Sequence, residues 1–304
     1  MSGFPMRRVL GKTGLQVSPL GIGGGSLISD EDLLYAFERG INYFFFSSDL
    51  HHRSYSHSVK ALKSLCEQGS SVRHEVTLAT VSYVNDPEKI MGVLYDQFAE
   101  LRTDYIDVFH WGWVTDFYAI DKLFGVSTLL KDPGFAIRWK KLLEMEQTAL
   151  EVNQELVNRG LARFVGASFH SRSAARRSIP LLDVLMLRYN ILHTGIETDV
   201  LPFLVSDKSK APGVVAFNTG HEGTFALNTP LPGVPQTSPP PSIPDCYRFA
   251  LSNPKVDLLL MGPKNRLEID EALKMLESGP MSAEEIAAIK DYGQNQRKNM
   301  SLAE

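Results

Sequence analysis

The chain has 304 residues and a formal net charge of −4, with 43% hydrophobic and 22% charged residues. This balance is ordinary for a globular protein with a large core, and it gives no electrostatic reason to expect a nucleic acid or an anionic membrane as partner. No apolar run approaches the roughly 20 residues of a membrane-spanning helix. Cys66 and Cys246 lack metal-ligand spacing, so we expect reduced thiols in a cytoplasmic protein.

The N-terminal part of the chain predicts a β-hairpin followed by a strand–helix–strand unit. Segment 8–17 has two short strands around a glycine-bounded turn, and a strand ending in glycines follows at 18–25. A helix is expected to begin at Ser29, because the acidic residues 30–32 complement the positive end of a helix. Segment 41–46 is apolar without polar alternation, which is typical of a parallel strand covered on both faces.

Strands and helices then alternate to the end of the chain. Further strands are expected at 76–81, 105–110, 161–168, 182–187, 214–217 and 256–261. Eight strands after the hairpin predict a single (β/α)8 TIM barrel over residues 1–304, with the hairpin plugging its bottom and long mouth loops at 111–138 and 218–244. A doubly wound open sheet is the alternative, but the glycines at 21–25 lack the spacing of its phosphate-binding fingerprint.

Polar chemistry is concentrated in the loop after the second barrel strand, which contains His51, His52, Arg53 and Tyr55. Loops at the carboxyl ends of barrel strands build active sites in this fold class. A functional loop and a merely solvated one are equally favoured by this composition. Tyr55 lies beyond the expected position and is more readily explained by packing of the next helix.

Several segments, in the right order and spacing, resemble the aldo-keto reductase family. They are Arg8–Ser18, Gly40–Phe44, Thr103–Asp107, Gly160–Ser168, Arg188–Asn190 and Gly262–Asn265 with Asp270-Glu271. The resemblance runs from about residue 8 to residue 290. It implies a barrel that binds NADH or NADPH across its mouth and reduces a carbonyl compound. It also implies a Tyr acid whose pKa is lowered by a Lys–Asp pair, with a His that orients the carbonyl.

The catalytic positions of that family are mostly replaced. The Asp position falls on Phe45 or Phe46, and the Tyr position on Leu50 or His51. The Lys position falls on Val81, and the His position on Gly112. His110, two residues before Gly112, has the same strand parity and can face the same mouth, although a satisfied core histidine is the competing interpretation. An unassisted phenol titrates near 10 and imidazole near 6.5. We therefore predict that His51 and His110 supply the proton donor or orienting group.

The cofactor-binding positions implied by the resemblance are better matched. Ser168 and Asn190 correspond to residues that hold the nicotinamide carboxamide, Phe217 to the aromatic that stacks on the ring, Lys264 to the cation for the 2′-phosphate, and Glu271 to the adenine-side carboxylate. Phe169 and Met186 replace amide side chains of the family, and Glu268 places a negative charge near the phosphate position. The opposed charges predict weak discrimination between NADH and NADPH.

The remaining candidates concern the substrate. Trp111 and Trp113 predict a lid over an apolar small molecule, with His52 and Arg53 beside it, although packing of a long loop would use the same residues. His170 and His193 follow the fifth and sixth strands, and for both a structural hydrogen bond is favoured over catalysis. No metal-ligand spacing is present. A barrel turned to non-redox proton transfer, elimination or cyclisation, and a non-catalytic binding protein, remain as alternatives, and the oligomeric state is open.

Overall fold

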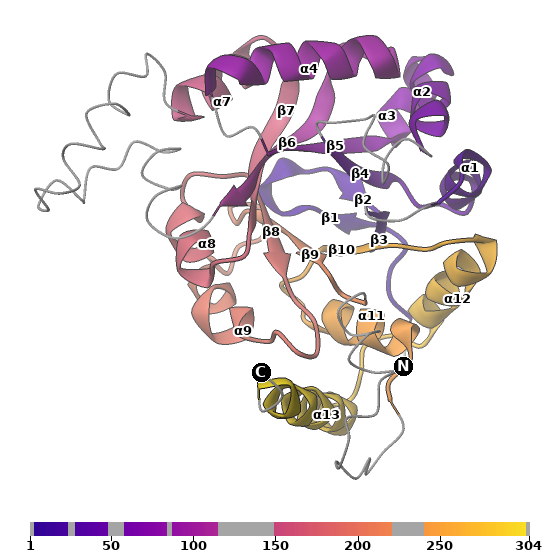
Figure 1. Ribbon diagram of the computed structural model, residues 1–304, viewed down its shortest axis with the longest axis vertical. Coiled ribbons are helices and arrows are strands. Elements are labelled where there is room, and N and C mark those ends of the chain that lie inside the picture. The colour runs from indigo at the N-terminus through magenta and orange to yellow at the C-terminus, as the bar shows by residue number, and fades with distance from the viewer. Residues whose placement is uncertain are drawn as a thin grey trace, which may run out of the picture.

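A computed structural model describes residues 3–23, 28–47, 58–83, 87–114, 149–220 and 240–301. Within these ranges, eight parallel strands close into a barrel in the order β10-β3-β4-β5-β6-β7-β8-β9 (Figure 1). Their bounds are β3 (Leu20–Ile22), β4 (Tyr43–Ser47), β5 (Thr77–Ser82), β6 (Ile106–Val114), β7 (Ala162–Phe169), β8 (Val184–Arg188), β9 (Gly213–Phe217) and β10 (Leu258–Met261). The closed parallel sheet confirms the predicted (β/α)8 TIM barrel.

Helices surround the barrel on the outside (Figure 1). The described helices are α1 (Asp30–Glu38), α2 (Val59–Glu67), α3 (Ser70–Glu75), α4 (Pro87–Leu101), α7 (Ala149–Asn158), α8 (Arg172–Ser178), α9 (Ile196–Asp199), α11 (Ile243–Ser252), α12 (Arg266–Glu277) and α13 (Ala283–Ser301). Ser29 caps α1 as predicted, because its side chain accepts a hydrogen bond from the Asp32 N–H at 3.1 Å. In the described ranges, no helix combines the length and apolar character needed to cross a bilayer.

The hairpin closes one end of the barrel, as predicted. Strands β1 (Arg8–Val9) and β2 (Gln16–Val17) pair antiparallel. Leu10, Leu15 and Val17 pack in one apolar cluster with residues from six barrel strands: Tyr43, Ala79, Val108, Val184, Met186, Val215, Leu258 and Leu260. The hairpin therefore lies against the inner face of the barrel. A second and larger cluster lies between the strands and the helices.

The fourth barrel strand is longer than the sequence predicts. The apolar run suggested an end at His110, with a mouth loop from 111 to 138, but β6 continues to Val114. Its pairing with β7 shifts register between Trp111 and Val114, which indicates a bulge. The rest of that predicted loop lies outside the described residues, as do residues 221–239 of the predicted loop 218–244. The end of the latter is helical, because α11 begins at Ile243.

An Asn or Asp closes each even-numbered strand of the barrel at its amino end, and we call these four residues the base clasps. They are Asn42, Asp107, Asp183 and Asp257. In each, a side-chain oxygen accepts a backbone N–H of the preceding strand or its approach: Ser18 to Asn42 (2.7 Å), Leu78 to Asp107 (2.9 Å), Val165 to Asp183 (3.1 Å) and Val214 to Asp257 (2.9 Å). The amino end of the barrel is therefore fastened by a repeated polar contact.

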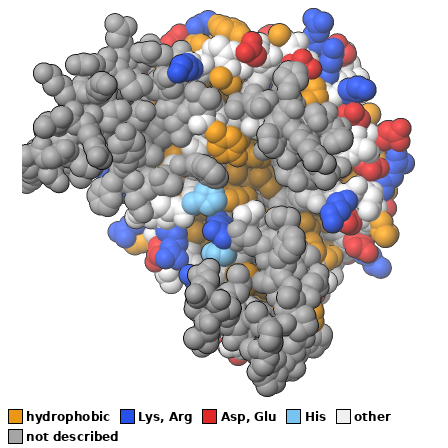
Figure 2. Space-filling view, in the orientation of Figure 1, with side chains coloured by type: hydrophobic (Ala, Val, Ile, Leu, Met, Phe, Trp, Pro, Cys, Tyr) orange, Lys and Arg blue, Asp and Glu red, His pale blue; other side chains and the backbone are white. Residues whose placement is uncertain are grey.

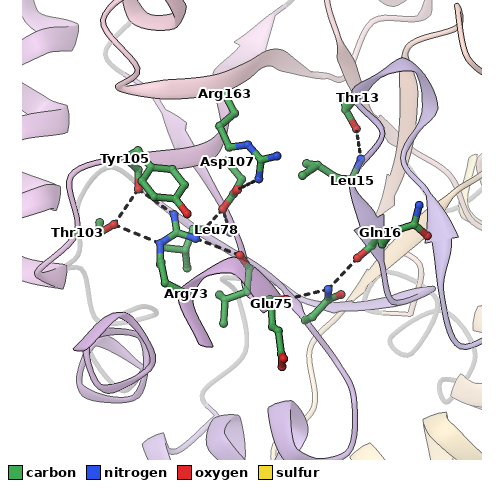
Figure 3. Close-up of polar contacts among 12 residues, drawn as sticks. Thr13, Leu15, Gln16, Arg73, Glu75, Leu78, Thr103, Tyr105, Asp107 and Arg163 are labelled. Atoms are coloured by element: carbon green, nitrogen blue, oxygen red, sulfur yellow. Dashed lines mark hydrogen bonds and ion pairs between the residues drawn. The ribbon is translucent and has the colours of Figure 1, made fainter. Parts of the chain in front are cut away.

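Asp107 is the base clasp that two arginines contact in addition to a backbone N–H (Figure 3). Its carboxylate accepts hydrogen bonds from Arg73 Nη1 at 2.9 Å and from Arg163 Nη1 at 2.8 Å. Only 1% of the Asp107 side chain and 7% of the Arg73 side chain are exposed. Arg73 also donates to the carbonyls of Val76 and Tyr105. A buried charge pair of this kind is tolerated because its donors and acceptors are satisfied.

Candidate active site at the barrel mouth

The carboxyl ends of the parallel strands meet at the barrel end opposite the hairpin, where active sites lie in this fold class. Phe45 on β4 and Phe217 on β9 are partly buried and pack on the inner apolar cluster. Ser168 on β7 is also buried, and it pairs in register with Met186 on β8. Figure 2 shows hydrophobic side chains in the central hollow of the molecule's face, with histidine and basic side chains at its edge. The mouth is therefore mainly apolar.

His110 points into the barrel, but it is completely buried. In register it lies between Val81 on β5 and Gly166 on β7. A methyl group at 166 would come within 2.9 Å of the imidazole Cδ2, so the glycine makes room for the ring. Nδ1 lies 3.2 Å from the Thr80 carbonyl oxygen, which can only accept, so Nδ1 carries the proton. Nε2 is buried and has no hydrogen-bond partner among the residues that the structure describes.

This geometry corrects the prediction that His110 donates a proton. Burial lowers the pKa of His110 from 6.5 to about 4, so the ring is neutral near pH 7. Its single N–H is already used by the Thr80 carbonyl. His110 is thus a buried hydrogen-bond acceptor, and the sequence argument failed because it used the pKa of an exposed imidazole.

The interior contains no ion pair at the two positions where the resemblance places Asp and Lys. The Phe45 ring meets the His110 ring edge-on, with centroids 5.9 Å apart. Val81 is fully buried and has the same strand parity as Ala79, which belongs to the inner cluster. These two positions therefore supply no charged partner that could lower the pKa of a tyrosine.

Phe217 is the best-placed of the predicted cofactor residues. It ends β9 and is partly buried, so part of its surface remains accessible at the mouth. The His170 ring, which follows β7, contacts it edge-on with centroids 5.4 Å apart. A ring supported at one side offers a firm surface on which a second planar ring can stack. The contact between His170 and Phe217 was not predicted, because it joins residues at the ends of two strands, β7 and β9, that are separated by β8.

The polar atoms of Asn190 are committed within the chain. Its Oδ1 accepts the backbone N–H groups of Leu192 and His193, both at 2.9 Å, and lies 3.1 Å from His193 Nδ1. Its Nδ2 donates to the Asn218 carbonyl at 2.9 Å. Asn190 therefore ties the loop after β8 to the loop after β9. This pattern favours a structural role for Asn190, and its predicted contact with a carboxamide stays a prediction.

The predicted adenosine end lies at the start of α12. Lys264 and Glu271 are exposed there. The Glu268 carboxylate accepts the backbone N–H of Lys264 at 2.9 Å, so this negative charge occupies the positive end of the helix. Arg266 donates from Nε to Asp32 Oδ1 at 2.9 Å. The surface at the start of α12 is therefore less favourable to a phosphate than the sequence Lys264, Asn265, Arg266 suggests.

The predicted lid is wrong for Trp111. Its side chain is fully buried in the cluster between barrel and helices, and its Nε1 donates to Asn153 Oδ1 on α7 at 2.9 Å. Successive residues of a strand face opposite sides, so Trp111 faces away from the barrel interior that contains His110. Trp113 lies in β6, and its side chain is outside the described residues, as are His51, His52 and Arg53.

Tyr83 is a mouth residue that the sequence argument missed. It follows β5 directly and has the strand parity of Ala79 and Val81, and 48% of its side chain is exposed. A methyl group at Gly112 would come within 2.5 Å of Tyr83 Cδ1 and 2.8 Å of the Ser82 carbonyl oxygen. The Tyr83 ring therefore lies over Gly112, the position where the resemblance expects a His. A glycine at that position was the available signal.

Two further observations bear on the kind of site. Among the described residues, no three His, Cys, Asp or Glu side chains come together as a metal site would require. Cys66 and Cys246 are free thiols, and burial raises the pKa of Cys66 to about 11 and that of Cys246 to about 12. Neither cysteine is therefore an activated nucleophile.

Comparison with solved structures places the fold. No protein-family model and no curated protein sequence matches the chain. An aldo-keto reductase from Bacillus halodurans, in its holo form, superposes with a TM-score of 0.69 at 20% identity, covering 94% of this chain and 95% of that one. An aldo-keto reductase from Klebsiella pneumoniae in complex with NADPH gives a TM-score of 0.66 at 15% identity, covering 95% and 96%. The chain therefore has the fold of the aldo-keto reductases over almost its entire length.

Proposed function

We propose that the protein is an NADH- or NADPH-dependent oxidoreductase that reduces a small or medium-sized apolar carbonyl compound at the barrel mouth. The observation that carries this proposal is Phe217, a partly buried ring at the end of β9 that makes a T-shaped contact with the His170 ring. Such a surface suits the nicotinamide ring, and Ser168 lies in the same ring of strands for its carboxamide. Bound nicotinamide would supply the hydride. The apolar residues Phe45 and Met186 suit an apolar substrate.

Nucleotide titration tests the proposal. Purified protein is titrated with NADH and NADPH while nicotinamide fluorescence is followed. Micromolar dissociation constants are expected for the wild type, and Phe217→Ala is expected to weaken binding by about tenfold, because one aromatic contact contributes roughly 0.5–1.5 kcal/mol beyond its area. Phe203→Ala is the matched control, because Phe203 is exposed on the outside, against Arg176. No binding of either nucleotide by the wild type would reject the proposal.

The choice between the two nucleotides follows from the start of α12. Lys264 offers one exposed cation, while Glu268 already occupies the helix end and Arg266 is held by Asp32. We expect less than about tenfold discrimination, since exposed charges each contribute on the order of 1 kcal/mol or less. Glu268→Gln should shift the preference toward NADPH by a few fold. A hundredfold preference for NADPH in the wild type would contradict this placement.

A non-redox reaction at the same mouth is the second candidate. Phe45 and Val81 stand where the ion pair of a conventional reductase is expected, and His110 is a buried neutral acceptor. These features suit proton transfer, elimination or cyclisation of an apolar compound as well as they suit reduction. A non-catalytic binding protein is third. Nucleotide binding followed by NADH consumption with a carbonyl substrate separates the three. His51 remains a proposed proton donor, in a loop outside the described residues.

A further inference from the structure

Phe217 is held from behind by the residues that follow β8. The Tyr189 N–H donates to the Phe217 carbonyl at 3.3 Å, directly beyond the last register pair of the two strands, Arg188 with Phe217. The next residue, Asn190, donates from Nδ2 to the Asn218 carbonyl at 2.9 Å. Asn218 has a φ of 56°, a left-handed conformation that is uncommon outside glycine, and the chain bends there. The position of the Phe217 ring therefore depends on where residues 189 and 190 are held.

The Tyr189 side chain points away from the mouth, into the layer between the strands and the helices. It is buried, and its ring packs on the Phe249 ring of α11 with centroids 5.3 Å apart. Its hydroxyl donates to Glu197 Oε1 on α9 at 2.7 Å. Burial and the neighbouring carboxylate raise the pKa of the phenol, so the hydroxyl keeps its proton and remains a donor. Tyr189 thus connects the backbone at Phe217 with a carboxylate in the helical layer.

Helix α13 contacts the same part of the chain from outside (yellow in Figure 1). Its Lys290 donates to the second carboxylate oxygen of Glu197, Oε2, and 29% and 24% of the two side chains are exposed. Three residues further along α13, a methyl group at Gly293 would come within 2.0 Å of the Ile191 carbonyl oxygen. The glycine therefore allows the α13 backbone to approach the residue that follows Asn190.

We propose that α13 is a brace that fixes Phe217 at the mouth, with Glu197 and Tyr189 as positioning residues; its effect on nicotinamide binding rests on the proposed reductase function. Glu197 joins the two sides, because one carboxylate oxygen accepts from Lys290 on α13 and the other from Tyr189. The Tyr189 backbone then holds Phe217. Coupling between two sites is reciprocal, so a nucleotide bound on Phe217 also steadies α13.

Amide hydrogen exchange of the nucleotide-free protein tests the brace without any ligand. Tyr189→Phe removes the bond to Glu197, and Gly293→Ala pushes α13 away from Ile191. Each should speed exchange in residues 184–193 and 213–220 by at least about fivefold, because the lost contact lowers the cost of local opening. Exchange in β5, on the far side of the barrel, should keep its wild-type rate.

Two variants elsewhere in the helical layer are matched controls. Trp111→Phe also removes one buried hydrogen bond, the one to Asn153 on α7. Gly92→Ala also adds a methyl group to a helix, but that group meets nothing within 4 Å. Both controls should leave exchange in residues 184–193 and 213–220 unchanged. Unchanged exchange there in Tyr189→Phe, or an equal acceleration in β5, overturns the brace, and this variant decides if Gly293→Ala does not fold.

Fluorescence titration with NADH measures what the brace does at the mouth. Tyr189→Phe and Gly293→Ala should each weaken NADH binding by about fivefold or more, the lower end of typical coupling between sites. Lys290→Gln should weaken it in the wild type and have no further effect in Tyr189→Phe, because both changes act through Glu197. Bound NADH should also slow amide exchange in residues 286–296 of α13, and this protection should be lost in Tyr189→Phe.

The outcomes separate the two proposals. Wild-type NADH affinity in both Tyr189→Phe and Gly293→Ala overturns the positioning role, while nucleotide binding still supports a reductase. Weakening of the same size in Trp111→Phe also overturns it, because the effect would then follow from lost stability anywhere in the helical layer. Failure of the wild type to bind NADH or NADPH overturns the reductase itself, and exchange in the nucleotide-free protein still decides whether α13 fixes the end of β9.

Discussion

The two ends of the barrel differ in their polar contacts. At the hairpin end, the base clasps Asn42, Asp107, Asp183 and Asp257 each accept a backbone N–H from the preceding strand or from the residues that lead into it. At the mouth, Phe45 and Val81 line the interior, and Nε2 of the buried His110 ring receives no hydrogen bond from any described residue. Backbone N–H groups at the hairpin end need these acceptors whatever the substrate, whereas the mouth can change with the chemistry. The hairpin end therefore preserves the fold, and the mouth determines the function.

The largest expected effect tests the hairpin end. Asp107→Ala removes the acceptor of Arg73 and Arg163 and leaves the buried Arg73 guanidinium without its carboxylate. Removing one partner of a buried pair typically costs about 3–5 kcal/mol, so urea unfolding should show a loss in this range. A loss below about 1 kcal/mol would mean that the clasp does not fasten the barrel.

The next effect is a pH dependence that arises at the mouth. The pKa of His110 is about 4 in the folded protein and near 6.5 when the chain is unfolded. As the pH falls, the unfolded chain therefore binds a proton at His110 before the folded protein does. The free energy of unfolding should fall by about 3 kcal/mol as the pH drops from above 6.5 toward 4. His110→Gln should remove this part of the slope. The exposed His74→Gln should leave it unchanged, and equal slopes in wild type and His110→Gln would contradict the assignment.

A smaller effect is expected at the outer layer of β6. Trp111→Phe keeps the aromatic packing but removes the N–H that donates to Asn153 Oδ1. A buried acceptor without its donor costs about 1–3 kcal/mol. Thermal or urea unfolding should show this loss, with little effect on nucleotide affinity. A loss of nucleotide binding with unchanged stability would contradict this placement and would support a role for Trp111 at the substrate site.

The smallest effect sets the baseline for surface charges. Arg159 and Glu155 form an i,i+4 pair on α7 at 2.8 Å, with 45% and 34% of their side chains exposed. Breaking such a pair by Glu155→Gln should cost about 0.5 kcal/mol or less, and added salt should reduce the difference. A cost comparable to that of Asp107→Ala would show that the contrast between buried and exposed pairs has been overstated.

Much of the fold could be predicted because its signals are local. Apolar runs without alternation located the strands, and Ser29 with its acidic followers located the start of α1. The base clasps also have a sequence signal that was overlooked: Asn42, Asp107, Asp183 and Asp257 each precede an inward-facing residue of a barrel strand. The sequence contains the repeat, but only the structure shows that each of the four side chains accepts a backbone N–H at the amino end of the barrel.

The site was less predictable because it depends on side-chain direction and burial. Trp111 was predicted to form a lid, but β6 continues past it and its side chain faces the helices. His110 was assigned the pKa of an exposed imidazole, which its burial lowers. Tyr83 was missed because its relation to Gly112 involves two neighbouring strands. Each of these errors concerns a property that neighbours in space impose.

A crystal structure of the protein with bound NADH tests the central claim most directly. We predict a nicotinamide ring stacked on Phe217 beside His170, at the carboxyl end of β9. The base clasps should be unchanged on binding. A nucleotide bound elsewhere, or a Phe217 face that stays empty at saturating NADH, would contradict the claim that this mouth is a nicotinamide site.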